Sequence, residues 1–428
     1  MKKTDPRYQN YLDILKEELV PAMGCTEPIA VAYAAGKARQ VLGQPVERVH
    51  VEASLNIIKN VKSVVVPNTG GLRGIEVSAV AGIVAGNPDK KLEVISEVDN
   101  EGREKIKAFL KSKEVTVVPA QSNLIFDLTV TVCSKDSCAS VRIANFHTNI
   151  VEIKKDGAVI FEQSGCEEVE NPVETDRSMM NVADIIDFSE SVDIEEVRPV
   201  IQRQIEYNTR ISEEGLSGNW GANIGSIIRD TWGDDIKVRA KAKAAAGSDA
   251  RMSGCELPVI IVSGSGNQGI TASVPVIEYA RELNVDEETL IRALLISNLI
   301  TIHQKTSIGR LSAFCGVVSA GVGAGAGITW LNGGGFNEIA HTIVNALAIV
   351  SGIICDGATA SCAAKIASAV EAGILGHCMY QQGQQFYGGD GIVTKGVENT
   401  IANVGRIGRD GMKETDKEII RIMLGIKN

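Results

Sequence analysis

The chain has 428 residues, enough for two domains or for one domain with a large insertion. Hydrophobic residues make up 44% of it and charged residues 22%, as in an ordinary globular protein. The net charge of −10 argues against nucleic acid and anionic membranes as partners, because both select basic surfaces, so a small metabolite is expected instead.

The first 20 residues contain acids and lysines and lack the apolar run of a signal peptide, which predicts a cytoplasmic protein with reduced thiols. The nine cysteines are an odd number for a framework of paired disulfides. In a reducing compartment, clustered cysteines bind metal or carry out chemistry more often than they form disulfides.

Residues 8–43 read as two helices interrupted by "PAMGCTEP". Cys25 directly precedes the second helix, with Thr26 as the expected N-cap and Pro28 in the first turn. A helix N-terminus lowers the pKa of a nearby thiol, which predicts a thiolate at Cys25. A small residue in an ordinary turn is the alternative interpretation.

From residue 46 to about residue 161, β-branched segments with partial alternation predict strands, with helices between some of them. The loop "PNTGGLRG" offers polar side chains at Asn68 and Thr69 and a flexible backbone at Gly70, which would suit a ligand carboxylate or a plain strand-to-helix turn. Cys133 and Cys138 flank a hairpin turn and receive no role.

After Pro172 the apolar spacing becomes helical and stays so to the C-terminus. The sequence therefore predicts an α+β fold. A mainly α-helical domain is formed by both chain ends, residues 1–45 and 172–428, and an α/β domain is inserted as residues 46–171.

The segment "GSGNQG" matches the dinucleotide pattern G-x-G-x-x-G, but the following sequence continues as helix and supplies no second strand ending in an acid. A glycine-rich helix start can still bind a carboxylate or phosphate through its N–H groups, and a tight turn is the alternative. The candidate ligand-binding residues there are Ser265, Gly266, Asn267 and Gln268.

Residues 311–330 contain no charge and have the length of a membrane span. They consist mostly of Gly, Ala and Ser, with few of the residues that favour lipid. The alternating glycines suit close backbone packing, so a buried helix is predicted rather than a membrane segment.

Three cysteines stand out because they share the Gly/Ala-rich helical region: Cys315, Cys355 and Cys362. Three thiolates can hold a [4Fe–4S] cluster and leave one iron open. Zinc is the rival, although no histidine has a zinc-finger spacing from these cysteines. Their spacing alone leaves the choice between a metal site and ordinary small residues open.

Together, "GCTEPIA", "HQKTSIGRLSAFCG" and "CDGATASC" resemble the L-cysteine desulfidase family, within the iron–sulfur L-serine dehydratase α-chain-like group. The resemblance runs nearly end to end. It implies a [4Fe–4S] cluster on Cys315, Cys355 and Cys362 and an active-site role for Cys25. The last two ligands are closer in sequence here than in the serine dehydratases, which favours the desulfidase branch.

The resemblance leads us to expect β-elimination of L-cysteine to sulfide, ammonia and pyruvate without pyridoxal phosphate. Cys25 would be the base or would handle the leaving sulfur. Residues 68–70 and 265–268 would hold the substrate carboxylate, and Lys305 and His303 would act as charge partners. The alternatives are an iron–sulfur L-serine dehydratase, a membrane or transport-associated protein and a non-catalytic iron–sulfur sensor. A homo-oligomer is left open.

Overall fold

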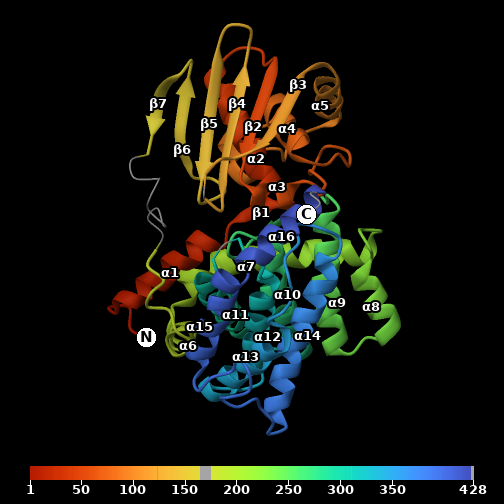
Figure 1. Ribbon diagram of the computed structural model, residues 1–428. Coiled ribbons are helices and arrows are strands. Elements are labelled where there is room, and N and C mark those ends of the chain that lie inside the picture. The colour runs from red at the N-terminus through yellow and green to blue at the C-terminus, as the bar shows by residue number, and fades with distance from the viewer. Residues whose placement is uncertain (123, 164–174, 310, 426–428) are drawn as a thin grey trace.

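The computed structural model describes residues 1–122, 124–163, 175–309 and 311–425. Figure 1 shows a sheet with its covering helices in the upper part and a larger group of helices below it. The N-terminal helix and the segments after residue 175 belong to the lower group, so both ends of the chain contribute to it.

The sheet has six strands in the order β3-β2-β4-β5-β6-β7. Only β2 and β3 are parallel, because the chain between them crosses over through helices, whereas each other neighbouring pair is antiparallel. The strands are β2 (Arg48–Ala53), β3 (Glu114–Pro119), β4 (Asp127–Cys133), β5 (Cys138–Ala144), β6 (Ile150–Lys155) and β7 (Ala158–Glu162).

Helix α2 (Thr26–Leu42) packs against β4 and β5 and against α4 (Ile75–Ala85), so it covers one face of the sheet. The burial of β4 alternates, with Leu128, Val130 and Val132 buried, as expected for a strand with one face against helices. The other helices here are α3 (Leu55–Val61), the 3-10 helix η1 (Pro88–Glu93) and α5 (Asn100–Ser112).

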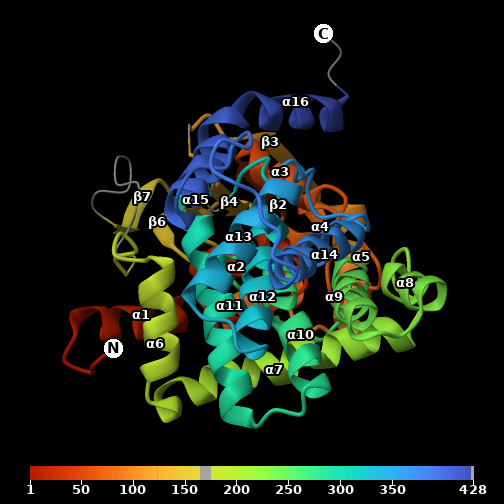
Figure 2. The ribbon, with the colours of Figure 1, turned by 90° about the horizontal axis from the view of Figure 1, so that it is seen from below.

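The helical part is built around α10, α11, α12 and α14, which pack on one another, and a two-stranded antiparallel sheet of β1 and β8 lies beside α7 and α10. Figure 2 shows these helices from below, with α6 and α7 along the outside. The elements are α1 (Pro6–Glu18), β1 (Pro21–Met23), α6 (Val182–Ser191), α7 (Ile194–Ser217), α8 (Ile224–Trp232), α9 (Ile236–Met252), β8 (Pro258–Ile260), α10 (Gly266–Glu282), α11 (Glu287–Ile308), α12 (Gly316–Leu331), α13 (Phe336–Val350), α14 (Cys362–Gln381), α15 (Val397–Arg406), the π-helix η2 (Ile407–Gly411) and α16 (Lys413–Leu424).

Most of the apolar segment 311–330 lies in α12, which is buried among other helices as predicted but begins only at Gly316, so that residues 311–315 precede the helix. A Cβ atom at Gly321 would lie 2.4 Å from the Ala369 carbonyl oxygen of α14, so only glycine allows the two backbones to approach this closely. Within the described ranges, none of the helices has the length and apolarity that crossing a membrane requires.

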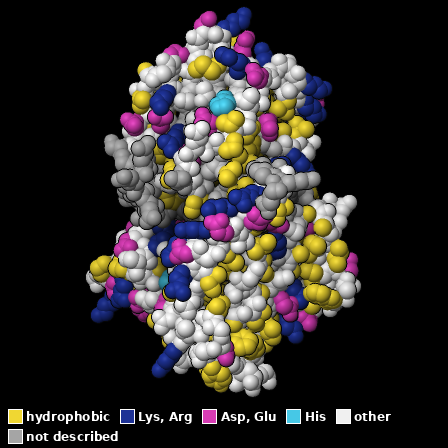
Figure 3. Space-filling view, in the orientation of Figure 1, with side chains coloured by type: hydrophobic (Ala, Val, Ile, Leu, Met, Phe, Trp, Pro, Cys, Tyr) yellow, Lys and Arg dark blue, Asp and Glu magenta, His cyan; other side chains and the backbone are white. Residues whose placement is uncertain are grey.

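The α+β fold predicted from the sequence is confirmed. The division into residues 1–45 plus 172–428 and residues 46–171 stays a prediction, because its second boundary falls outside the described residues. Figure 3 shows Lys and Arg intermixed with Asp and Glu on one face of the molecule, in keeping with the net charge.

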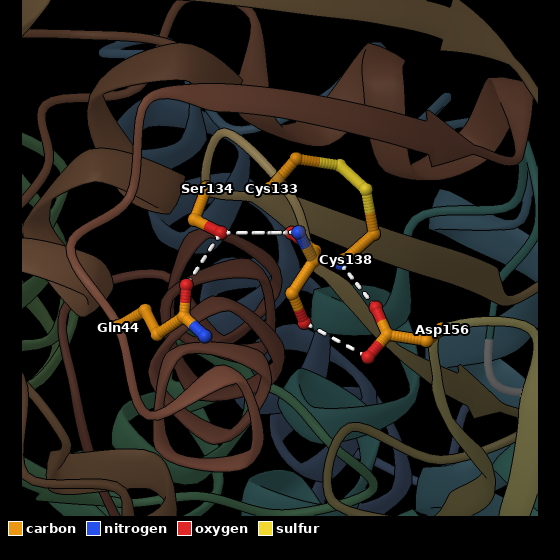
Figure 4. Close-up of a disulfide and its surroundings, with 6 residues drawn as sticks. Gln44, Cys133, Ser134, Cys138 and Asp156 are labelled. Atoms are coloured by element: carbon orange, nitrogen blue, oxygen red, sulfur yellow. Dashed lines mark hydrogen bonds between the residues drawn. A yellow bond between two sulfur atoms is a disulfide. The ribbon is translucent and has the colours of Figure 1, made fainter.

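One expectation about the cysteines is wrong: the thiols are not all reduced, because Cys133 and Cys138 form a disulfide. They are directly opposite each other in the β4–β5 hairpin, where cross-strand side chains are close enough to bond (Figure 4). Asp156 holds the turn by accepting from the Cys138 N–H at 2.8 Å and from the Ser137 hydroxyl at 3.0 Å. Cys166 lies outside the described residues.

Candidate active site

Cys315 and Cys355 lie side by side because the short segments that carry them pair in antiparallel fashion. The Cys315 N–H donates to the Ile353 carbonyl at 3.0 Å, and the Cys355 N–H donates to the Ala313 carbonyl at 2.7 Å. Cys362 is the first residue of α14, and the turn between Cys355 and that helix brings the third thiol back toward the other two. The structure thus brings together the three cysteines that the sequence singled out.

Two of the three cysteines have strongly shifted pKa values of opposite direction. A hydrogen bond from the Cys315 thiol, together with the positive charges of Lys59 and Lys365, holds the pKa of Cys355 below its usual range. The same hydrogen bond and burial raise the pKa of Cys315, while burial and the nearby Cys355 raise that of Cys362. The trio therefore favours at least one thiolate at neutral pH.

Thiols are the donors that iron–sulfur clusters use. In the part of the chain that the structure describes, no three His, Cys, Asp or Glu side chains converge enough to hold one ion. A cluster binds its thiolates on separate irons, so it needs three facing thiols rather than convergence on one point. Cys315 is the N-cap of α12 and Cys362 begins α14, so two helix N-termini favour negative charge here.

Cys25, the candidate catalytic residue, is the N-cap of α2 and is only 4% exposed. The expectation that Thr26 caps this helix is therefore wrong by one residue, and Thr26 begins the helix instead. The Cys25 thiol donates to the Glu27 carboxylate at 3.0 Å. The other oxygen of Glu27, Oε1, accepts a hydrogen bond from the Asn60 amide at 2.9 Å. His147 Nε2 lies 3.9 Å from the same oxygen.

The prediction of a low pKa at Cys25 is also wrong, although the helix start is where it was expected. Burial and the negative charge of Glu27 raise the pKa of Cys25 well above its usual range, and the opposing effect of Arg251 is smaller. Burial would also raise the pKa of Glu27, but His147 and the hydrogen bond from Cys25 outweigh it and hold that pKa well below its usual range. These surroundings favour a neutral thiol at Cys25 beside an ionised, buried Glu27 carboxylate.

Helix α10 connects the beginning of α2 with the first of the three cysteines. The Thr26 hydroxyl donates to the Gly264 carbonyl at 2.9 Å, so α2 and α10 begin next to each other. On the other side, a Cβ atom at Gly316 would lie 2.6 Å from Cδ of Gln268, so the Gln268 side chain covers the residue that follows Cys315.

Helix α3 makes the same connection from the opposite side. The Asn60 side chain binds Glu27, and a Cβ atom at Gly357 would lie 2.7 Å from the Lys59 carbonyl oxygen. Gly357 has a φ of +102°, which glycine adopts readily and which lets the Cys355–Cys362 turn rest on α3. These contacts therefore form a closed ring that passes from α2 to α3, the Cys355–Cys362 turn, α12, α10 and back to α2. Cys25 and the three cysteines lie on this ring of elements, which is called the ring below.

The loop at residues 68–70 has a more structural position than the sequence suggested. The Asn68 amide donates to the Ile95 carbonyl at 2.9 Å, and the Thr69 hydroxyl donates to the Val66 carbonyl at 2.7 Å. Gly70 has a φ of +73° and is exposed. Both side chains are thus used to hold the loop, which contacts the ring where Pro67 packs against Gly24.

The residues at 265–268 do lie at a helix start, as predicted. Ser265 is the N-cap of α10 and makes no side-chain capping bond, and Asn267 Oδ1 accepts from Arg251 at 3.0 Å. Gln268 Oε1 is buried without a hydrogen-bond partner. This end of α10 therefore combines N–H groups that have no acceptor within the helix with an orphaned side-chain acceptor.

His303 and Lys305, the expected charge partners, lie near the end of α11. His303 Nε2 is 2.7 Å from Glu398, which also accepts from the Val182 N–H at 2.7 Å, so this histidine ties α11 to α15 and α6. Lys305 is buried, and its carbonyl accepts from the Gly309 N–H. The structure gives His303 a structural hydrogen-bond contact with Glu398 rather than a contact with the ring.

Sequence reasoning missed Glu27, Asn60, His147 and Arg251. Glu27 was visible in the motif that contains Cys25, and its spacing of two residues from that thiol was a usable signal. Asn60 and His147 come from distant segments, and no local pattern marks them. Within the described segments, a surface pocket of about 420 Å³ lies at the far end of α10, around Arg281 and Leu290, away from the ring.

Known proteins are similar to this chain over most of its length. A family model described as the serine dehydratase alpha chain matches residues 89–421. The UPF0597 protein of Desulfitobacterium hafniense strain Y51 is 62% identical over 426 residues, covering 99% of this chain and 98% of that protein. Those of Lachnoclostridium phytofermentans and Treponema denticola are 53% and 46% identical, covering 97% and 98% of this chain and 100% and 98% of those proteins.

The names of these relatives state no substrate, whereas the matched family consists of lyases that depend on iron–sulfur clusters. The match covers more than half of the chain and includes all three clustered cysteines. The chain therefore belongs to the serine dehydratase alpha chain family.

Proposed function

We propose that the protein is an L-cysteine desulfidase that converts L-cysteine to sulfide, ammonia and pyruvate without pyridoxal phosphate. Cys315, Cys355 and Cys362 would hold a [4Fe–4S] cluster. The observation that supports this proposal most is the ring of contacts that puts these thiols, Cys25 and the start of α10 around one region. The sequence motifs that resemble the desulfidase family supply the choice of substrate.

When bound, the cluster would supply a Lewis acid, because three protein thiolates leave one iron open. The protein side chains would position the substrate beside it. The N–H groups of the first turn of α10 suit the substrate carboxylate, and Lys59 and Lys365 place positive charge near the thiolates. Residues 68–70 would support this site through their contact with the segment before Cys25.

Cys25 would remove the substrate Cα proton as its thiolate. The electron pair of the Cα–H bond becomes the Cα=Cβ double bond, and the Cβ–S bond breaks, releasing the sulfur as sulfide. The aminoacrylate product then takes up water and yields ammonia and pyruvate. A thiol with a raised pKa is a strong base once ionised, which suits a weakly acidic C–H group.

The raised pKa of Cys25 predicts a particular pH dependence. Because the neutral thiol dominates at neutral pH and the pKa of Cys25 lies well above its ordinary value, kcat/KM should increase from about pH 7 and still be increasing at about pH 9, without levelling off at the ordinary thiol pKa. Glu27 stays ionised throughout this range because its pKa is low, so it adds no change of its own. A pH–rate profile of sulfide release measures this. The Cys25→Ser variant is the control, because it retains the titration of the substrate thiol. A wild-type rate that falls over this range would contradict the base role.

The alternative function is an iron–sulfur L-serine dehydratase, and the two differ in the leaving group. We expect turnover of L-cysteine to be at least about tenfold faster than that of L-serine, because hydroxide is the poorer leaving group without a dedicated acid. Anaerobically purified protein should be assayed for pyruvate with each amino acid under the same conditions. Equal rates, or faster release from L-serine, would assign the protein to the dehydratase branch.

A further inference from the structure

Arg251 is a buried, positively charged residue near the candidate active site, and it has no role in the mechanism proposed above. It lies in the last turn of α9 and is 2% exposed. A guanidinium stays protonated under all conditions in which a protein is folded. Its positive charge is close enough to Cys25 to lower the pKa of that thiol, although burial and Glu27 have the larger effect.

The guanidinium of Arg251 has too few partners for a buried charge. One nitrogen, Nη1, donates to the neutral Asn267 side chain at 3.0 Å, whereas Nε is buried without a hydrogen-bond partner. Among the described residues, no carboxylate lies within ion-pair distance of it. A buried charge without a counter-ion is costly, so such a group indicates an anion that is supplied from outside the chain.

The surroundings of Arg251 are suited to an anion. Its Nε lies against the first residue of α10, since a Cβ atom at Gly266 would be 2.3 Å away. The first-turn N–H groups of this helix have no acceptor within it, and the Ser265 side chain makes no cap. Gln268, in the same turn, reaches the residue after Cys315. A group bound here would therefore lie between Cys25 and the three cysteines.

We propose that Arg251 and the N-terminus of α10 bind the α-carboxylate of the amino-acid substrate, and that Arg251 makes the site specific for free amino acids. This rests on the proposed function for the identity of the substrate. The planar guanidinium can form two parallel hydrogen bonds to a carboxylate, whereas an amide or ester lacks the negative charge that would balance it.

Binding of non-reacting amino acids to the anaerobically purified protein tests this directly. L-alanine carries the α-carboxylate but has no leaving group at Cβ, and L-alaninamide lacks the negative charge. Titration calorimetry should show L-alanine binding on the order of 100-fold more weakly to Arg251→Gln than to the wild type. The affinity for L-alaninamide should be the same for both proteins.

The control variant is Arg142→Gln, which removes a half-buried arginine that pairs with Asp127 in the sheet, and L-alanine affinity should not change. If Arg251→Gln does not fold, as judged by circular dichroism, Arg251→Lys keeps the charge but loses the planar fork. Its affinity for L-alanine should then decrease about tenfold. Equal affinity of the variant and the wild type for L-alanine, or no binding by the wild type, would overturn the inference.

A sulfide assay on the same samples separates this inference from the proposed function. Weakened L-alanine binding in Arg251→Gln, combined with no sulfide from L-cysteine in the wild type, would retain the carboxylate site and reject the desulfidase. Sulfide release from L-cysteine by Arg251→Gln with the wild-type KM would support the desulfidase and reject the role of Arg251 in carboxylate binding.

Discussion

Replacing Cys355 by serine is expected to remove most of the iron and nearly all activity. Cys355 is the one of the three whose pKa is held below its usual range, so it is the most readily available thiolate. A hydroxyl stays protonated at neutral pH and is a poor ligand for iron, which prefers soft thiolates in such clusters. Iron content and the broad visible absorbance of the anaerobically reconstituted protein measure the loss. Cys315→Ser and Cys362→Ser should behave in the same way.

The matched control is Cys378→Ser, which changes a free cysteine in the C-terminal half of α14, several turns from Cys362. It should keep about four irons, the full set for one cluster, together with wild-type absorbance. Full iron content in the Cys355→Ser protein would refute the ligand assignment, and equal loss in both variants would indicate general instability instead.

Replacing Cys25 by serine is expected to lower turnover by on the order of 100-fold or more while the iron content stays unchanged. Serine preserves the size and the hydrogen bond to Glu27, but its hydroxyl does not ionise in the accessible pH range. The residue lies on α2, and none of its contacts in the described structure is with the cluster cysteines themselves. Iron and sulfide release should be measured on the same sample.

Each outcome of the Cys25 experiment has a distinct meaning. An intact cluster with lost turnover supports the base role. Loss of iron would make Cys25 a fourth ligand, and full activity would make it an ordinary N-cap residue. Cys255→Ser is a suitable control, because Cys255 is also buried with a raised pKa but lies in the loop after α9.

Local sequence patterns predicted most of the fold, whereas a shared site for the three cysteines was implied by the family resemblance. Period-two and helical spacing identified the sheet region and the helices, and glycine-rich composition identified the buried α12. Cys315 and Cys355 meet because two short segments pair, which no local pattern specifies, although their shared Gly/Ala-rich region pointed to it. The helix start at Ser265 was also visible in the glycines that precede it.

The protonation state of Cys25 could not be predicted from its position at a helix start. A helix N-terminus favours a thiolate, but here complete burial and a carboxylate two residues away have the larger effect. That carboxylate is in turn held ionised by His147, which arrives from the β5–β6 connection. Only the folded arrangement reveals which of these opposing influences dominates.

Arg251 and the disulfide were missed for different reasons. Nothing in the local sequence distinguishes Arg251 from a surface arginine, because its burial and its lack of a carboxylate partner among the described residues are tertiary features. For Cys133 and Cys138, the hairpin was recognised, but the expectation of a reducing compartment outweighed the fact that the two residues face each other across the strands.

The most direct test of the proposed function is the release of sulfide and pyruvate from L-cysteine by one protein sample, measured with the cluster and after its removal. The proposal predicts equal amounts of both products from the iron-loaded protein, little product after iron removal, and recovery on anaerobic reconstitution. Absence of sulfide from the fully loaded protein, or an unchanged rate after the iron is removed, would contradict it.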